Sequence, residues 1–286
     1  MPELAASLGS LIGESADQLQ RAGIPEPRRQ ALLIWTGVSG ARPGEALLQA
    51  HSGVAITRAA EFRRAIERRV LGEPLCHITG WAGFRHLSLR SDRRALIPRP
   101  ETEGLVDLLL QRVRSGAVVD VGTGSGCIAL SLALEGAFQR VVAVDCSSEA
   151  ITLARANAEL AGIPGAVELV RADLCTALRP EAFDALISNP PYLTLGEYAT
   201  LDQSVRDWEP ALALKSGPDG LEATTRLLAE GRAVLRPGGW LALEVDCTRA
   251  GAAARLAGGH GWDQVSIHMD LFGRERYLLA RRSETR

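Results

Sequence analysis

Short apolar runs rich in β-branched residues alternate with helical stretches from about residue 116 onward. We expect strands at Ala117–Val121, Arg140–Val144, Ala166–Arg171, Phe183–Ile187 and Trp240–Val245. Helices are expected between them, for example at Cys127–Leu134, Ser148–Ala161 and Gly220–Leu235. Because parallel neighbouring strands need helical crossovers, this alternation predicts an α/β fold with a mostly parallel, doubly wound sheet.

The last two expected strands, Trp262–His268 and Arg276–Ala280, are separated only by a short turn around Phe272 and Gly273. A connection this short makes a hairpin, since a parallel pair would need a long crossover. The last strand is therefore expected to run antiparallel to the others, at one side of a seven-stranded sheet.

The part of the chain before residue 99 has a different pattern. Residues 1–74 read as helical, with Leu4, Leu8, Leu11 and Ile12 at helical spacing. Residues 75–98 are expected to form a β-hairpin that links two domains. We therefore expect a small N-terminal helical domain at 1–74 that docks the substrate, the hairpin at 75–98, and the main domain at 99–286. An arginine-bearing helix at 57–70 is either a solvated face or a docking face for an acidic partner.

A glycine-rich loop joins the first expected strand to its helix. Candidate ligand-binding residues in it are Asp120, Gly122, Thr123, Gly124, Ser125 and Gly126. Glycines let the backbone approach a ligand closely, and the amides at a helix start favour a carboxylate or phosphate. A dinucleotide fingerprint would need glycine at position 127, where this chain has Cys127. The other reading of the loop is a tight strand–helix turn.

Aspartates stand at the ends of three successive strands. Asp120 suits the ammonium of an amino acid, Asp145 can accept both hydroxyls of a ribose, and Asp173 can accept from an adenine amino group, with Leu174 against the ring. Each aspartate alone would more often be a helix cap. Together they describe a nucleoside that carries an amino acid, which is S-adenosylmethionine.

The fourth expected strand is followed by Asn189, Pro190, Pro191 and Tyr192. The Asn189 side-chain oxygen and the Pro190 carbonyl are neutral acceptors that could each take one N–H of a planar NH2 group. Tyr192 offers a ring on which a flat group can stack. Taken alone, Asn-Pro is a common turn signal. In this context it is a candidate substrate clamp, with Asn189 also beside the cofactor.

In their order, these motifs resemble the class I S-adenosylmethionine-dependent methyltransferases that act on amino groups. The segments Leu96–Glu103 (LIPRPETE), Asn189–Tyr192 (NPPY), Asp207–Leu212 (DWEPAL) and Gly217–Leu221 (GPDGL) resemble the bacterial HemK/PrmC family. The resemblance implies a Rossmann-like methyltransferase fold. It also implies methyl transfer to the side-chain nitrogen of the glutamine in the Gly-Gly-Gln motif of peptide-chain release factors.

Three positions depart from the family pattern. The family usually has Glu-x-Gly-x-x-Gln near the fifth strand, whereas this chain has Asp246 and Arg249 at the third and last of these positions. His77 stands where a tyrosine is common. These departures bear on substrate docking rather than on the cofactor site.

The composition of the chain argues against several classes of protein and of binding site. The formal net charge is −2 over 286 residues, which argues against a protein that binds bulk nucleic acid. The five cysteines are an odd number without a C-x-x-C pair, and no histidines stand at ligand spacing, so we expect no metal and a reducing cytoplasm. We expect neither a signal peptide nor a membrane span.

Two other functions remain open from the sequence. NPPY would serve an exocyclic amino group of DNA or RNA equally well, although the charge balance disfavours a stable nucleic acid partner. The fold could also serve as a non-catalytic binding module. Against that reading, the chain keeps Gly122, Gly124, Gly126 and Asn189, which a decayed site would have no reason to retain.

Overall fold

The computed structural model describes residues 4–284, and the chain divides into two compact units. The smaller unit is Met1–Trp81 with Asp202–Trp208, and the larger unit is Ala82–Leu201 with Glu209–Arg286. Because the sequence returns briefly to the smaller unit at Asp202, the larger unit is built from two separate stretches of chain.

The smaller unit is helical around its own core. Its helices are α1 (Leu8–Arg21), α2 (Pro27–Ser39), α3 (Pro43–Leu48), α4 (Ile56–Val70), α5 (Leu75–Thr79) and α10 (Gln203–Arg206). Leu19, Ile34 and Phe62 are fully buried, and the rings of Trp35 and Phe62 meet edge to face with centroids 5.6 Å apart. The prediction of an N-terminal helical region is confirmed.

One detail of that prediction was wrong. The helix expected around Leu4 is instead a strand, β1 (Leu4–Ser7), which pairs antiparallel with β2 (Gly53–Ala55). The helix α1 starts only after Ser7, whose side chain accepts a hydrogen bond from the Ser10 amide and caps the helix. This cap and the long-range pairing outweigh the helical spacing of the apolar residues.

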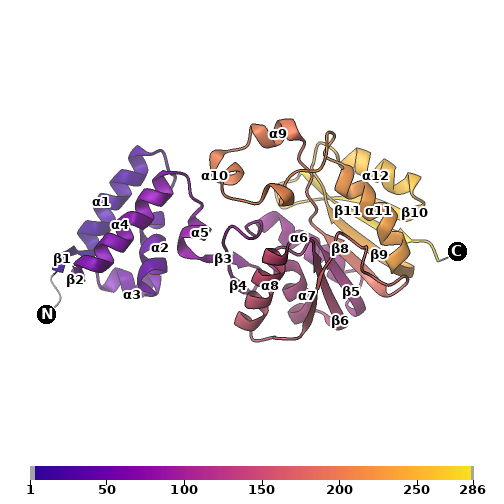
Figure 1. Cartoon of the computed structure of the whole chain (residues 1–286), viewed down its shortest axis with the longest axis horizontal. Helices are drawn as coiled ribbons and strands as arrows, with labels where there is room; N and C mark the ends of the chain where they lie inside the picture. Colours follow the sequence, from indigo (N-terminus) through magenta and orange to yellow (C-terminus); the bar gives the residue numbers. More distant parts are fainter. Residues whose placement is uncertain (1–3, 285–286) are drawn as a thin grey trace. The chain divides into compact units, whose positions relative to one another are not determined.

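The larger unit contains a seven-stranded sheet (Figure 1). Its strands are β5 (Ser115–Val121), β6 (Ala137–Asp145), β7 (Val167–Arg171), β8 (Phe183–Ser188), β9 (Leu235–Glu244), β10 (Trp262–Met269) and β11 (Glu275–Arg282). Their order is β10-β11-β9-β8-β5-β6-β7, and β11 runs antiparallel to both of its neighbours. The predicted mostly parallel sheet with an antiparallel last strand is confirmed.

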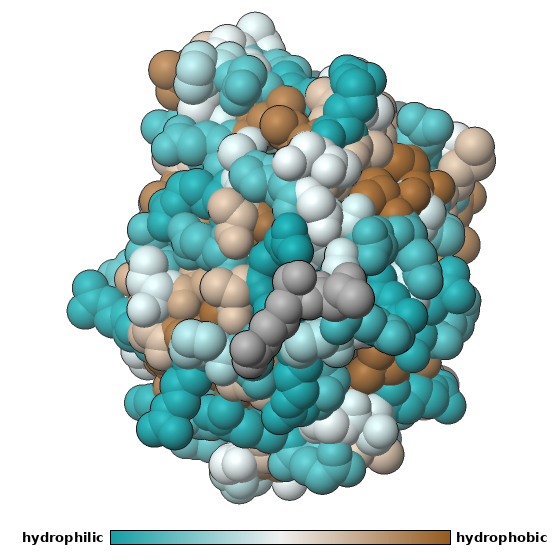
Figure 2. Space-filling model, turned by 90° about the vertical axis from the view of Figure 1, so that its right-hand side faces the viewer, coloured by the Kyte–Doolittle hydropathy of each residue, from teal (hydrophilic) through white to brown (hydrophobic). Residues whose placement is uncertain are grey.

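Helices cover both faces of this sheet. One core packs α6 (Pro100–Leu110), α7 (Cys127–Glu135) and α8 (Ser148–Leu160) against residues such as Val118. The other packs α11 (Glu222–Val234) and α12 (Ala250–Gly259) against residues such as Val119. Adjacent strand residues thus enter opposite cores, as strand geometry requires. On the molecular face shown in Figure 2, hydrophobic residues form separate patches among hydrophilic ones.

The expected hairpin is present but shorter than residues 75–98. It consists of β3 (Trp81–Phe84) and β4 (Leu87–Arg90), with Arg85 at the turn in the left-handed region at φ 52°. The Arg85 guanidinium donates to Glu135 at 2.6 and 2.7 Å and to Asp107 at 2.7 Å, which ties the turn to α7 and α6. Residues 75–79, expected in the hairpin, form α5 instead.

The remaining elements of the larger unit are α9 (Leu195–Ala199) and a short 3-10 turn at Ala211–Ala213. Both lie in the segment that follows β8. Within residues 4–284, none of the helices has the length and apolar character that crossing a membrane requires.

Candidate active site

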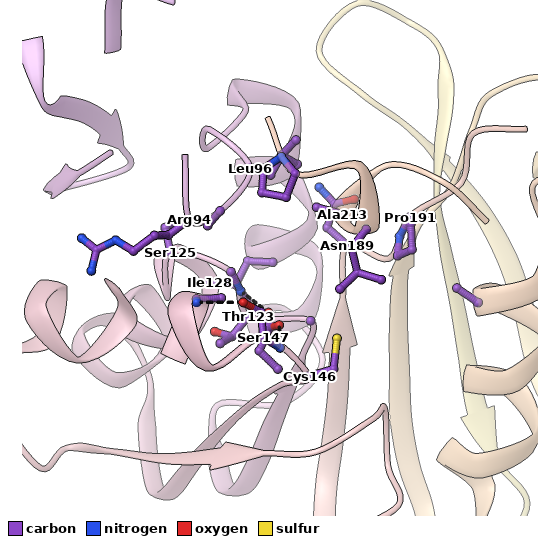
Figure 3. A pocket seen from close by; sticks show the side chains of 18 of the residues that line it. Arg94, Leu96, Thr123, Ser125, Ile128, Cys146, Ser147, Asn189, Pro191 and Ala213 are labelled. Atoms are coloured by element: carbon purple, nitrogen blue, oxygen red, sulfur yellow. Dashed lines mark hydrogen bonds between the residues drawn. The ribbon is translucent and has the colours of Figure 1, made fainter. Parts of the chain in front are cut away.

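A cavity of about 470 Å³ opens at the carboxyl ends of β5, β6, β7 and β8, entirely within the larger unit. In the strand order the direction of winding reverses between β5 and β8. Crevices at such reversals are where open α/β sheets bind ligands. The volume lies in the range of small-molecule sites. In Figure 3, Thr123, Ser125 and Ser147 lie on one side of the pocket, and Asn189 and Pro191 lie at the end of β8.

The glycine loop forms one wall of this cavity through Gly122, Thr123, Gly124 and Ser125. Gly122 and Gly124 have φ values of 76° and 55°, a region that favours glycine. Gly126 does not line the cavity. It caps α7 at φ 84°, and a Cβ there would lie 3.1 Å from the Cβ of Ala154. This third glycine therefore packs the loop against α8.

Asp120 lies behind the loop and is fully buried rather than lining the cavity. Its Oδ2 accepts hydrogen bonds from the Thr123 hydroxyl at 2.6 Å and the Ala129 amide at 3.2 Å. Its Oδ1 is buried without a hydrogen-bond partner among the described residues. Burial raises the pKa of Asp120 to about 7, and the charge of Asp145 acts in the same direction, although the two hydrogen bonds oppose the shift.

Asp145 is the last residue of β6 and lines the cavity. Its two oxygens accept from the backbone amides of Gly124 and Ser147, each at 2.9 Å. These bonds join the glycine loop to the start of α8. A carboxylate has about four acceptor positions, so both oxygens retain room for ligand hydroxyls.

Asp173 and Leu174 also line the cavity, at the end of β7. The Asp173 carboxylate is held by Arg226, which donates to it at 2.9 and 3.4 Å. Leu174 adopts a left-handed conformation at φ 46°, which is uncommon for a bulky residue. The arginine was not found from the sequence, because it lies more than fifty positions away on α11.

Asn189 reaches the cavity from the end of β8. Its Nδ2 donates to the Thr102 hydroxyl at 3.0 Å, and that hydroxyl lies 2.7 Å from Glu244 Oε2. Thr102 and Glu244 are buried, at 2% and 1% exposure. Sequence analysis missed both residues as parts of the site, although Thr102 belongs to the LIPRPETE segment and Glu244 is the first residue of the segment compared with the family's Glu-x-Gly-x-x-Gln.

The other three residues of the tetrapeptide are placed differently. Pro191 lines the cavity, whereas Pro190 and Tyr192 are outside the lining that the described residues form. Pro190 is buried. The Tyr192 hydroxyl points at Glu244 Oε1, 3.5 Å away, and burial together with the Glu244 charge raises the pKa of this tyrosine.

Hydrogen bonds link the LIPRPETE segment (Leu96–Glu103) to the segment after β8. Glu209 is buried, and its carboxylate accepts from the Ile97 amide at 2.9 Å and from Arg99 at 2.5 Å. Ile97, Arg99 and Pro210 all line the cavity. Two family-like segments that are far apart in the sequence are thus joined into one wall.

The arrangement fits a nucleoside that carries an amino acid. The glycine loop brings backbone close to the cavity, Asp145 supplies acceptors for hydroxyls, and Asp120 has a buried, unpartnered Oδ1 behind the loop. No group of three or more His, Cys, Asp or Glu side chains able to hold a metal ion occurs in the described part of the chain.

Comparison with known proteins agrees with this geometry. Residues 100–206 match the family "Methyltransferase small domain", and residues 10–80 match "PrmC N-terminal domain". The chain is 42% identical to "Release factor glutamine methyltransferase" of Deinococcus radiodurans, over 96% of this chain and 99% of that protein. It is 36% identical to the protein of the same name from Nitratidesulfovibrio vulgaris, over 97% and 96%. The chain belongs to the release factor glutamine methyltransferase family.

A solved methyltransferase structure has a similar fold. A methyltransferase from Pyrococcus furiosus superposes with a TM-score of 0.53 at 19% identity, covering 79% of this chain and 98% of that one. As a release factor glutamine methyltransferase by family, the chain is an enzyme whose methyl donor is S-adenosylmethionine. The resemblance inferred from its motifs is confirmed over nearly the whole length.

Proposed function

We propose that this chain transfers a methyl group from S-adenosylmethionine to the side-chain amide nitrogen of the glutamine in the Gly-Gly-Gln motif of a peptide-chain release factor. Family membership supports the reaction class. The single observation that carries the proposal is the position of Asn189, which lines the same cavity as the glycine loop and Asp145. Donor and acceptor would therefore meet at the reversal point of the sheet.

For the cofactor, we assign the loop and the strand ends. The binding residues we propose are Asp120, Gly122, Thr123, Gly124, Ser125, Gly126, Asp145, Asp173, Leu174 and Asn189. Asp145 would hold the ribose hydroxyls, and Leu174 would pack on the adenine. Asp173 would share its carboxylate between Arg226 and the adenine amino group. Asp120 and Gly126 would act from behind the loop, the first through charge and the second through packing.

For the substrate, we assign Asn189, Pro190, Pro191 and Tyr192. The Asn189 side-chain oxygen and the Pro190 carbonyl accept one N–H each from the glutamine amide. This holds the nitrogen in place and aims its lone pair at the methyl group, and positioning of this kind can lower a barrier by about 7 kcal/mol or more. Pro191 lines the cavity and would contact the flat amide, whereas Tyr192 lies outside the lining and would contribute only if its ring turned toward the substrate.

The chemistry balances without a strong base. When bound, the cofactor supplies an electrophilic methyl group on a sulfonium. On transfer, the nitrogen–carbon bond would form as the sulfur–carbon bond broke, the bonding pair would stay on sulfur, and the methylated nitrogen would then lose one proton to solvent. Positive charge grows on the nitrogen during transfer, so two neutral acceptors on its N–H groups bind the transition state more tightly than the ground state.

We further propose that the N-terminal helical region, assigned from the sequence to 1–74, docks the release factor, with 75–98 as a link to the catalytic domain at 99–286. On α4, Arg63 and Arg64 are exposed, whereas Arg68 is paired with Glu73. The exposed pair would be available to an acidic partner. We place the enzyme in the cytoplasm, where release factors act, and without a stable nucleic acid partner.

The test is methyl transfer from labelled S-adenosylmethionine to three acceptors: a purified release factor, its Gln→Ala variant in the Gly-Gly-Gln motif, and DNA or RNA. Label on the first protein alone is expected. Label that persists on the Gln→Ala protein, or that enters only nucleic acid, would refute the proposal in favour of another acceptor. Binding of the cofactor without any transfer would favour a non-catalytic module.

A further inference from the structure

A continuous chain of hydrogen bonds runs from the half-buried Asn189, at the cavity, to the buried side chains of Thr102 and Glu244. Asn189 Nδ2 lies 3.0 Å from the Thr102 hydroxyl, which lies 2.7 Å from Glu244 Oε2. The three residues come from the end of β8, the first turn of α6 and the end of β9. Thr102 and Glu244 are 2% and 1% exposed, and Thr102 also contributes to the lining of the cavity.

With Glu244 ionised, counting protons fixes the direction of every bond in this chain. An ionised carboxylate can only accept, so the hydroxyl of Thr102 must donate its one proton to Glu244. Its oxygen is then available only as an acceptor on the other side. Asn189 must therefore present its NH2 group to Thr102, which leaves its side-chain oxygen directed elsewhere.

We propose that Thr102 and Glu244 are positioning residues that hold the Asn189 amide in the orientation in which its oxygen, and not its NH2 group, faces the substrate nitrogen. This inference rests on the proposed function, in which that oxygen accepts an N–H of the glutamine. A primary amide is nearly symmetric in shape, so packing alone cannot distinguish its two ends. The hydrogen-bonded series Glu244–Thr102–Asn189, called the relay below, distinguishes the oxygen of Asn189 from its NH2 group, because only the NH2 group can donate to Thr102.

The groups around Glu244 act on its protonation in opposite directions, and the relay operates in the ionised form. Arg276 Nη1 lies 4.0 Å from Glu244 Oε1 and is itself held by Asp270 at 2.8 Å. The Tyr192 hydroxyl is 3.5 Å from the same oxygen. The charge of Glu101 also acts on Glu244, and the charge of Glu244 acts on the buried Tyr277. Burial raises the pKa of Glu244, and the Glu101 charge adds to this, while Thr102, Arg276 and Tyr192 oppose it.

Reversing the polarity of the relay should reverse Asn189. In Glu244→Gln, Arg276 and the Tyr192 hydroxyl favour the amide oxygen at the position of Oε1, which turns the new NH2 group toward the Thr102 oxygen. The Thr102 hydroxyl is then free to donate to the Asn189 oxygen. The NH2 group of Asn189 would turn toward the substrate, where it meets N–H groups instead of accepting them. The side chain at 244 keeps its shape, so this change separates polarity from packing.

The experiment measures kcat and KM for a release factor, together with cofactor affinity by calorimetry. Glu244→Gln is expected to lower kcat by about 100-fold or more, in line with losing one preorganised polar contact in an active site. Cofactor affinity should stay near wild type. Thr102→Val, which keeps the shape but has no hydroxyl, should show the same loss, and Thr102→Ser should restore activity.

Matched controls are available away from the site. Glu168→Gln changes an exposed carboxylate that pairs with Arg140 on the sheet, and Thr152→Val removes an exposed hydroxyl that bonds only within α8. Both should leave kcat unchanged. In wild type at saturating cofactor and substrate, kcat should fall as pH drops through the pKa of Glu244, since a protonated carboxyl can donate. Glu244→Gln should lack that low-pH limb.

The outcomes separate this inference from the function on which it rests. If Asn189→Ala is inactive but Glu244→Gln and Thr102→Val keep wild-type kcat, the relay is refuted and the clamp stands. If Asn189→Ala itself is fully active, the proposed clamp fails first. Loss of kcat in Thr102→Ser equal to that in Thr102→Val would also overturn the relay, because serine retains the hydroxyl.

Discussion

Arg249 donates a hydrogen bond to the carboxylate of Glu197 at 2.6 Å. The same guanidinium donates to the Asp219 carbonyl at 2.8 Å and pairs with Asp246 at 3.1 Å. Glu197 belongs to α9, in the segment that follows the tetrapeptide. Arg249 therefore links Glu197 in α9 and the Asp219 backbone to the loop after β9. Asp246 and Arg249, two of the three departures from the family pattern, pair with each other.

The first prediction concerns this pair. Arg249→Gln removes two charge-assisted contacts and should destabilise the fold by about 1–3 kcal/mol. The double variant Asp246→Gly with Arg249→Gln, which recreates the family pattern, should cost less than the sum of the single changes, because it removes both charges together. Urea unfolding of the four proteins measures this coupling. Strict additivity would show that the two residues do not compensate each other.

A second prediction tests the packing of α6, the helix whose first turn contains Thr102. A Cβ at Gly104 on α6 would lie 2.6 Å from the buried hydroxyl of Tyr277, which bonds to the Glu101 carbonyl. Gly104→Ala should therefore cost about 1–3 kcal/mol of stability, as overpacking does. Gly258→Ala on α12 is the matched control. Nothing lies within 4 Å of its Cβ, so this change should be neutral or slightly stabilising, and equal effects of the two would contradict the packing.

A third prediction uses the pH dependence of stability. The pKa of Asp120 is about 7 in the fold, above its ordinary value, so the folded state holds a proton that the unfolded state has already released. Stability from this group is present at acidic pH and is lost as pH rises toward and through 7. The loss is a few kcal/mol at most, since one pKa unit corresponds to about 1.4 kcal/mol.

Asp120→Asn removes that dependence and can keep the bonds from Thr123 and Ala129, because its side-chain oxygen can occupy the place of Oδ2. Between pH 5 and about 8 the stability of the wild type relative to this variant should therefore decrease. Unfolding curves for the cofactor-free proteins at several pH values measure the difference. A difference that stays constant over this range would mean that Asp120 is ionised throughout.

A fourth prediction concerns the cofactor. Asp145→Ala should weaken S-adenosylmethionine binding by about 100-fold, since hydrogen bonds to a charged group contribute about 1.5–3 kcal/mol each. It also frees the amides of Gly124 and Ser147, which loosens the loop. Calorimetry gives the affinity, with Thr152→Val as a control outside the cavity. Unchanged affinity would remove Asp145 from the site.

Much of the larger unit could be predicted from the sequence. The β-branched runs mark the seven strands because a sheet covered on both faces needs apolar residues at nearly every position, as at Val118 and Val119. The glycine loop and Asn189 each come directly after one of these apolar runs, so the sequence also predicts their places at strand ends. The antiparallel β11 followed from the length of its turn alone.

Other features depend on contacts that leave no local pattern. The pairing of β1 with β2 joins residues about fifty positions apart, and α5 replaces part of an expected hairpin. Arg226 reaches Asp173 from another helix. Thr102 and Glu244 are one hydroxyl and one carboxylate among many until the fold brings them beside Asn189. Spacing along the chain cannot reveal such partners.

The central claim is that the methyl group goes to the glutamine side-chain nitrogen held by Asn189 and Pro190. It is tested most directly by incubating the enzyme with S-adenosylmethionine and a purified release factor, and then locating the methyl group by tandem mass spectrometry. We predict one methyl group on the side-chain nitrogen of the Gly-Gly-Gln glutamine, and none when Asn189→Ala replaces the wild type. A methyl group on any other residue, or full modification by Asn189→Ala, would contradict the account.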